Sequence, residues 1–362
     1  MIIRIGVIDS FKQSNIAAVI LEVSATLNAV GLFSDLEIDE QVLLQELIDE
    51  PTKFGLTEDD IERYEEEPFA AANEVREILA SEIFKIITDR ASELGDAYPF
   101  TIDPASRTMN LKDADQIDES GLSVIALGLH NLLRETELVQ ISSDDRKEFG
   151  KIFAKMFEYI SALALSAEVE GYVWSTGPIR SSRKLVKQLS HVTKRIGSGQ
   201  PKEHHELEAH EVDANDGGID ALAIKSNDGK IAADCVLYLL GATIQSGDRK
   251  NKIIGHDKIV RFRRFFKVEA EAALQGIHAI PFPRQETEAL RCRDANCRYF
   301  PLEVILRNLR QHASIDRHKR YTPYLNRISR NILVYSRSLS EVVTMELNGT
   351  ESVASIPPSC GS

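Results

Sequence analysis

The chain has 362 residues, of which 43% are hydrophobic, so it is long enough for two domains that each bury a core. No run of about 18 apolar residues is present, which argues against a transmembrane helix. The first residues also lack the layout of a signal peptide. Four cysteines are too few to staple a chain of this length. These features predict a soluble, cytoplasmic protein with reduced thiols.

The formal net charge of −13 conceals two halves of opposite sign. Residues 1–150 carry 12 basic and 32 acidic side chains, a balance of −20. Residues 171–340 carry 29 basic and 18 acidic side chains, a balance of +11. A basic half favours a polyanion partner, because lysines and arginines that neutralise phosphates release counterions. The alternative is a dipolar protein whose halves attract each other.

Hydrophobic spacing predicts an acidic, mostly helical domain over residues 1–170. Its expected elements are two helices within 15–50, a helix at 70–94, a hairpin at 97–112 and helices at 121–134 and from Ser143. A basic domain follows at 171–340, and residues 341–362 read as a tail. The basic domain alternates strand and helix signals, so we expect an α+β or α/β fold with a central mixed sheet. Its expected elements are helices at 181–196, 256–273 and 302–311 and strands at 219–224, 235–244 and 276–282.

Polar residues cluster at the ends of these expected strands. Asp216-Gly217-Gly218-Ile219-Asp220 precedes the first strand, and Gln245 follows the second. If the two strands are neighbours, Asp220 lies beside the Thr243–Gln245 segment. A carboxylate beside a second oxygen ligand suits Mg²⁺ or Mn²⁺, and a nearby lysine can orient an attacking water. The simpler alternative is an ordinary Asp-Gly turn.

The stretch from about 181 to 283 resembles the PD-(D/E)xK nuclease superfamily, within it the modification-dependent and phage-defence restriction nucleases. The likeness rests on the basic helix, Asp-Gly-Gly-Ile-Asp-Ala-Leu-Ala and the buried strand that ends in a glutamine. It implies a restriction-endonuclease-like core, catalytic Asp220 and Gln245, and an antiviral Mg²⁺-dependent endodeoxyribonuclease activity. The family's lysine position is Gly247 here, so Lys250, or else Lys252, would supply the amine. Glu208, Glu211 or Asp216 would supply the second acidic group, and Asp216, which shares the glycine turn, is preferred as the metal ligand beside Asp220.

Seven basic residues are candidates for contacts with nucleic-acid phosphates. They are Arg183, Lys184, Lys187, Lys252, Lys258, Arg261 and Arg264. A second hypothesis is an inactive nuclease-like module that binds nucleic acid or protein, which Gly247 favours. The acidic domain is the candidate surface for a partner defence protein. Cys292 and Cys297 are read as structural thiols, with a zinc site as the alternative.

Overall fold

The computed structural model describes residues 81, 84–103, 105, 108–113, 115–134, 143–170, 172–175, 182–206, 219–225, 235–244, 253–269, 272–314 and 330–334. The helices expected within 15–50 and the tail at 341–362 lie outside the described residues. The chain divides into two compact units, of which the second comprises Asp118–Ser123 and Lys151–Ser338. The division therefore falls inside the long helix α6 (Ser143–Val169), whereas the sequence suggested a change at 170–171.

The first compact unit, which includes the residues up to Ile117, contains the expected hairpin. Strand β1 (Phe100–Asp103) pairs antiparallel with β2 (Thr108–Leu111), just after the short helix η2 (Gly95–Ala97). Residues 84–94 are helical. Tyr98 and Phe100 pack edge to face, with ring centroids 5.3 Å apart, and both are buried. The hairpin prediction is thus confirmed, and its aromatic residues supply the local core.

Helix α5 (Glu119–Arg134) begins with a side-chain cap, as expected for a helix that starts after an aspartate. The Oδ1 atom of Asp118 accepts hydrogen bonds from the amides of Ser120 and Gly121 at 2.9 and 3.0 Å. Helix α6 buries the apolar stripe that predicted it. None of the described helices has a stretch long and apolar enough for a bilayer crossing.

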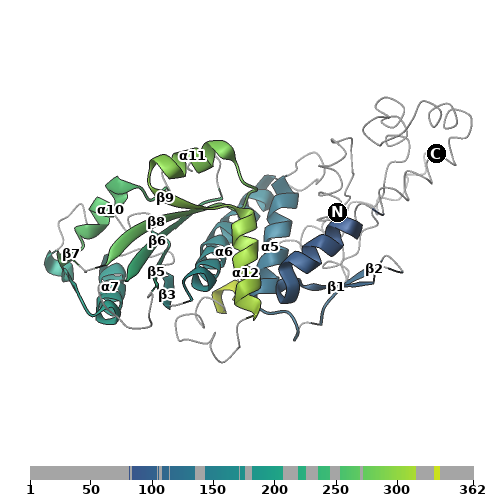
Figure 1. Ribbon diagram of the computed structural model, residues 1–362, viewed down its shortest axis with the longest axis horizontal. Helices are drawn as coiled ribbons and strands as arrows, with labels where there is room; N and C mark the ends of the chain where they lie inside the picture. The colour runs from purple at the N-terminus through teal and green to yellow at the C-terminus, as the bar shows by residue number, and fades with distance from the viewer. Residues whose placement is uncertain are drawn as a thin grey trace, which may run out of the picture. The chain divides into compact units, whose positions relative to one another are not determined.

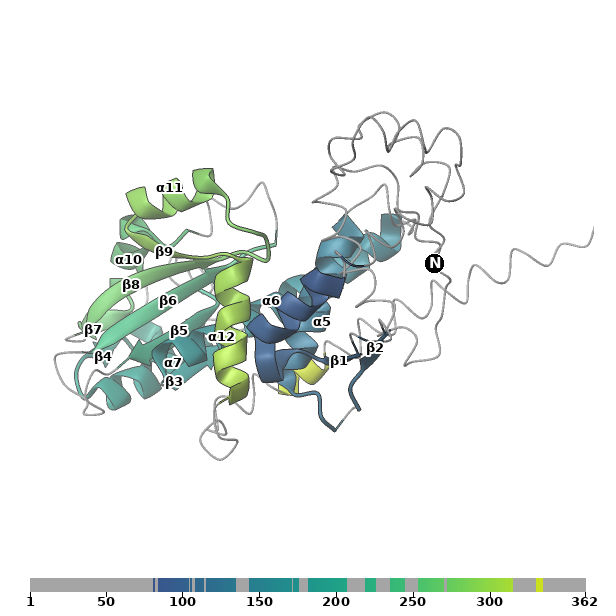
Figure 2. The same cartoon turned by 45° about the vertical axis from the view of Figure 1, so that its right-hand side comes forward.

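The second unit is built on a five-stranded mixed sheet with the order β3-β5-β6-β8-β9 (Figures 1 and 2). Its strands are β3 (Tyr172–Ser175), β5 (Ala221–Lys225), β6 (Val236–Ala242), β8 (Ala273–Ala279) and β9 (Cys297–Phe300). The pairs β3/β5 and β5/β6 are antiparallel, whereas β6/β8 and β8/β9 are parallel. Parallel neighbours require crossover connections, which here contain helices. The predicted mixed sheet is therefore confirmed.

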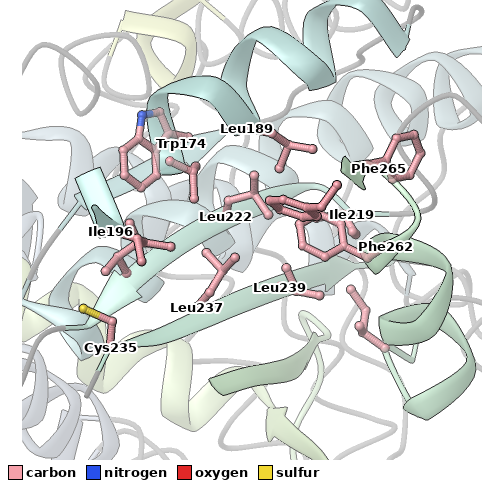
Figure 3. Close-up of a cluster of buried hydrophobic side chains, with 14 residues drawn as sticks. Trp174, Leu189, Ile196, Ile219, Leu222, Cys235, Leu237, Leu239, Phe262 and Phe265 are labelled. Carbon is pink, nitrogen blue, oxygen red and sulfur yellow. The ribbon is translucent and has the colours of Figure 1, made fainter. Parts of the chain in front are cut away.

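Helices α7 (Ser182–Ile196) and α10 (His256–Arg263) cover one face of this sheet. Figure 3 shows Leu189 of α7 and Phe262 of α10 packed against Leu222 and Leu239 of the central strands. The inward residues of α7 recur every three or four positions, so they form one stripe. Because both faces of β5 and β6 are covered, their sequences are almost continuously apolar.

The opposite face of the sheet meets the end of α6. Lys225 of β5 donates to the Glu168 carbonyl at 3.4 Å, and Arg298 of β9 pairs with the Glu168 carboxylate at 2.5 Å. The Arg298 guanidinium also lies over the Tyr238 and Phe300 rings. The Glu168 carboxylate and the two aromatic rings thus hold the Arg298 side chain against this face of the sheet.

The helix predicted at 256–273 is wrong beyond Arg263. The chain leaves the helix and forms strand β7 (Phe266–Val268), which pairs antiparallel with β4 (Gln200–Pro201). Phe262 and Phe266 remain in edge-to-face contact at 5.5 Å and stay buried. The phenylalanines at positions 262, 265 and 266 have the spacing of a helix. Pairing with β4 nevertheless gives residues 266–268 the conformation of a strand.

The final strand and helices complete the unit. Helix α11 (Glu286–Asp294) connects β8 to β9, and α12 (Leu302–Ser314) follows β9. In both views α11 lies beside β9 (Figures 1 and 2). The helix predicted at 302–311 is confirmed. The strand predicted at 276–282 starts earlier, at Ala273. Strands β3 and β9 were not predicted, since four residues carry little periodic signal.

Candidate functional site

Asp220 lies at the end of the sheet where β6 and β8 finish and β5 begins, here called the strand-end edge. Its Oδ2 atom accepts a hydrogen bond of 2.7 Å from the Ala242 amide, at the last residue of β6. The next residue, Thr243, donates its amide to Ala279 of β8 at 3.1 Å. Asp220 therefore contacts Ala242, the residue before the Thr243–Gln245 segment, and its expected place beside that segment stays a prediction.

A local irregularity places the Asp220 side chain there. The Asp220 amide donates to the Leu240 carbonyl at 2.7 Å, although the register pairs Leu240 with Ala221. Two successive residues thus oppose one residue of β6, which is the count of a β-bulge. Ile219 accordingly lies in the same core cluster as Leu222 and Leu239. The bulge lets the carboxylate accept a hydrogen bond from the amide of Ala242, further along β6.

Asp220 is 1% exposed. A carboxylate at this depth is held mainly by backbone donors and by its immediate neighbours, because burial without partners would be costly. The hydrogen bond to Ala242 is therefore also a structural contact, since it satisfies the amide of the last residue of β6. The hydrogen bond between Asp220 and Ala242 is thus compatible with Asp220 as a metal ligand and with Asp220 as a structural residue.

Several predicted site residues lie outside the described residues. These are Asp216, Gln245, Lys250 and Lys252, together with the side chains of Arg183 and Lys184. Their convergence on Asp220 therefore stays a prediction. The backbone of Arg183 and Lys184 belongs to the first turn of α7, as expected.

The described residues that were predicted to contact nucleic-acid phosphates differ in their solvent exposure. Lys187 of α7 and Arg261 of α10 are exposed, as is Arg264 at the end of α10. Lys258 is half-buried, and its charge acts on Cys297. Both helices cover the same sheet face. The three exposed cations are the ones that a phosphate backbone can reach.

A buried polar cluster beside β8 was not predicted. His278 of β8 lies with Nε2 3.4 Å from Oε1 of Glu288 on α11, and these side chains are 0% and 1% exposed. Arg291, one turn further along α11, pairs with Glu288 at 3.0 Å. His278 sits beside Gly241 in the register of β6 and β8. A histidine inside an apolar strand, followed by an acidic helix start, was the available sequence signal.

The implied Mg²⁺ or Mn²⁺ ion requires oxygen ligands. Among the described residues, no group of three or more histidine, cysteine, aspartate or glutamate side chains is arranged to hold a metal. Asp220 has the right donor chemistry, and the other two members of the expected set, Asp216 and Gln245, lie outside the described part. The zinc alternative for Cys292 and Cys297 gains no third ligand from the described residues.

Comparison with known proteins adds no relative. No protein-family model, no curated protein and no solved structure matches this chain.

Proposed function

We propose that the protein is a metal-dependent nuclease that hydrolyses phosphodiester bonds in DNA, in defence against foreign DNA. The observation that carries the proposal is the Asp220 carboxylate, which is hydrogen-bonded to Ala242 at the strand-end edge, three residues before Gln245. Ligand and substrate sites of mixed and parallel sheets favour the carboxyl ends of the strands. The likeness of residues 181–283 to PD-(D/E)xK nucleases supports the same assignment.

The residues of this chain divide the work as follows. Asp220, with Asp216 as its expected partner, would hold the divalent ion, and the Ala242 amide donates to the Asp220 carboxylate and so orients it. When bound, such an ion polarises the phosphate and favours ionisation of a water. Gln245 completes the pocket, and Lys250, or else Lys252, orients that water. Arg261 and Arg264 bind the phosphate backbone from α10.

A second candidate function is a nuclease-like module that binds DNA without cutting it. The burial of Asp220 at 1% exposure favours this candidate, because a metal ligand must share space with the ion and with a substrate phosphate. Gly247 at the expected lysine position favours it as well. A partner protein bound by the acidic region is compatible with either candidate.

Plasmid cleavage with Mg²⁺ or Mn²⁺ tests both candidates. Asp220→Asn keeps an oxygen that accepts from the Ala242 amide but removes the charge, so it separates chemistry from folding. For the nuclease we expect cleavage by the unmodified chain, reduced about a hundredfold or more in Asp220→Asn. Asp294→Asn is the matched control, since this aspartate is exposed on α11, and it should cleave normally.

The outcomes separate the candidates. Equal nicking by the unmodified chain and Asp220→Asn overturns the assignment of Asp220. If neither protein cuts while both shift DNA in a gel, the binding module is supported and the nuclease is rejected. The melting temperature of Asp220→Asn is measured in parallel. If it equals that of the unmodified chain, the lost activity does not reflect unfolding.

A further inference from the structure

Cys292 and Cys297 come together through a tight chain reversal between α11 and β9. Cys292 belongs to the last turns of the helix and Cys297 is the first residue of the strand. Asn296 between them adopts φ of 52°, the left-handed conformation that asparagine tolerates. Its carbonyl accepts a hydrogen bond of 2.9 Å from the Gln275 side chain of β8. The reversal is therefore anchored to the sheet, and both thiols enter one small buried cluster with Ile253.

The two sulfurs have different surroundings. The neighbouring Cys292 side chain lowers the pKa of Cys297, whose Sγ donates to the Arg298 carbonyl oxygen at 3.5 Å. The Ile254 amide and the charge of Lys258 lower the pKa of Cys297 further, against the opposing effect of burial. The contact with Cys297, together with burial, raises the pKa of Cys292 well above the ordinary range. The pKa of Cys297 is thus lowered and that of Cys292 raised, although both side chains lie in the same buried cluster.

The remaining described cysteine differs from this pair. Cys235 lies in the large apolar cluster of the sheet and its covering helices, and it is 1% exposed. Among the described residues that cluster contains no second cysteine, and a buried thiol without such a neighbour in apolar surroundings is normally inert. Cys297 is 6% exposed and lies on β9, which has β8 as its only strand partner in the sheet. Cys297 therefore exposes slightly more of its surface to a small oxidant than Cys235 does.

We propose that Cys292 and Cys297 form an oxidisable dithiol, which a small peroxide converts into a disulfide that links α11 to β9. The two thiols are reduced in this structure. The inference is independent of nuclease activity, because it rests on the small buried cluster that the two cysteines share and on the chain reversal at Asn296 that brings them together.

The reaction balances with peroxide as the oxidant. The Cys297 thiolate attacks one oxygen of hydrogen peroxide, the O–O bond breaks, and a sulfenic acid and hydroxide form. The Cys292 sulfur then attacks the sulfenic sulfur, the S–O bond breaks, and hydroxide leaves. The hydroxide ions take up the protons of the two thiols and become water. Two thiols lose two electrons in total, and the peroxide gains them.

Oxidation would change the surroundings of the segment that leads into α10. The Ile254 amide lies beside Cys297 and lowers its pKa, and the Ile254 backbone lies directly over Gly276 of β8. Cys292 is also four residues from Glu288, whose carboxylate meets His278. The disulfide would therefore join α11 to the start of β9, next to the segment that leads into α10.

The test treats the full chain with hydrogen peroxide and digests it with trypsin under non-reducing conditions. Arg293 lies between the two cysteines, so cleavage separates Cys292–Arg293 from Asp294–Arg298 unless a disulfide joins them. We expect the joined peptide after peroxide treatment and its loss on reduction. Cys235→Ser should yield it equally. In Cys292→Ser, Cys297 should stop at a sulfenic acid that dimedone traps.

The relative rates decide the assignment. We expect Cys297 to react roughly tenfold faster than Cys235, because its pKa is lowered and its side chain is more exposed. In Cys297→Ser, dimedone labelling of Cys292 should be slower than labelling of Cys297 in Cys292→Ser. The proposal is overturned if the unmodified chain gives no joined peptide while Cys235 or Cys360 is oxidised, or if Cys292 reacts first. The decisive peptide comes from the unmodified protein, so a variant that fails to fold leaves the test intact.

Discussion

Gly276 of β8 lies directly beneath the backbone of Ile254, where the loop before α10 crosses the sheet. A Cβ atom at position 276 would be 1.9 Å from the Ile254 carbonyl oxygen and 2.9 Å from its carbonyl carbon. Ile254 is itself fully buried in the core cluster beneath α7 and α10. Because the obstructing atoms belong to backbone, a side chain at 276 would force the loop off the sheet.

Gly276→Ala is therefore expected to destabilise the protein by about 2–4 kcal/mol, as for other overpacked core positions. The measurement is the free energy of unfolding from urea denaturation. Gly150→Ala is the matched control, because a Cβ there meets no atom within 4 Å and position 150 is inside helix α6. The control should stabilise by about 0.5–1 kcal/mol. Equal effects at the two positions would contradict the close approach of Ile254.

Glu288 is a buried carboxylate between His278 and Arg291, and its removal should be costly. Glu288→Ala leaves a fully buried histidine without its ionic neighbour, while Arg291, which is 47% exposed, regains water. We expect a loss of about 2–4 kcal/mol in unfolding free energy. Glu286→Ala on the same helix removes an exposed carboxylate 3.9 Å from Arg284 and should cost about 0.5 kcal/mol or less. A similar loss in both variants would exclude a special role for the buried cluster.

The Glu206 carboxylate joins the short helix η3 (His204–Glu206) to β7 in a pH-dependent way. A hydrogen bond from the Glu203 amide and the contact with Lys267 lower the pKa of Glu206 below its ordinary value of 4.5. Its interactions therefore stabilise the fold above about pH 4.5 and are lost as pH falls through the lowered value. Lys267 has a raised pKa for the same reason, so its charge persists at alkaline pH.

The Glu203 amide signal in an NMR titration reports this equilibrium, because that amide donates to Glu206 at 2.7 Å. We expect a titration midpoint below 4.5 in the unmodified protein. Lys267→Gln should move the midpoint upward, and Lys267→Arg should leave it low. A midpoint that ignores the charge at 267 would show that Lys267 does not contribute.

The exposed arginines of α10 should control binding to DNA phosphates. Arg261 and Arg264 are exposed and, within the described part of the chain, neither forms an ion pair. The double variant Arg261→Ala/Arg264→Ala should weaken DNA binding about tenfold and reduce the slope of log K against log salt by about 1.8. Fluorescence anisotropy at several salt concentrations measures both quantities.

A matched double variant separates local contacts from total charge. Arg284 and Arg293 lie near α11 and already face Glu286 and Asp294. Arg284→Ala/Arg293→Ala therefore removes the same charge from residues that are partly neutralised. We expect its salt slope to stay within about 0.5 of the unmodified value. Identical slopes in the two double variants would mean that DNA senses only the net charge.

Local sequence patterns predicted much of the second unit, because buried apolar residues recur at regular positions within a single helix or strand. The apolar stripe of α7 and the continuous apolar run of β6 each record which faces are covered. Strands β3 and β9 escaped prediction, since four residues are too short for a periodic signal. The end of α10 was also missed, because pairing of β7 with Gln200–Pro201 outweighs the helical spacing of the phenylalanines.

The amino-acid sequence by itself determined the split in charge, the helical and strand character of the long elements, and the presence of Asp220 beside a glycine pair. Those properties follow from composition and from short-range periodicity. Only the tertiary structure decided that Asp220 is buried against Ala242 and that Cys292 contacts Cys297. A one-residue bulge and a left-handed asparagine produce these contacts. Their geometry depends on which strands pair, which no local pattern specifies.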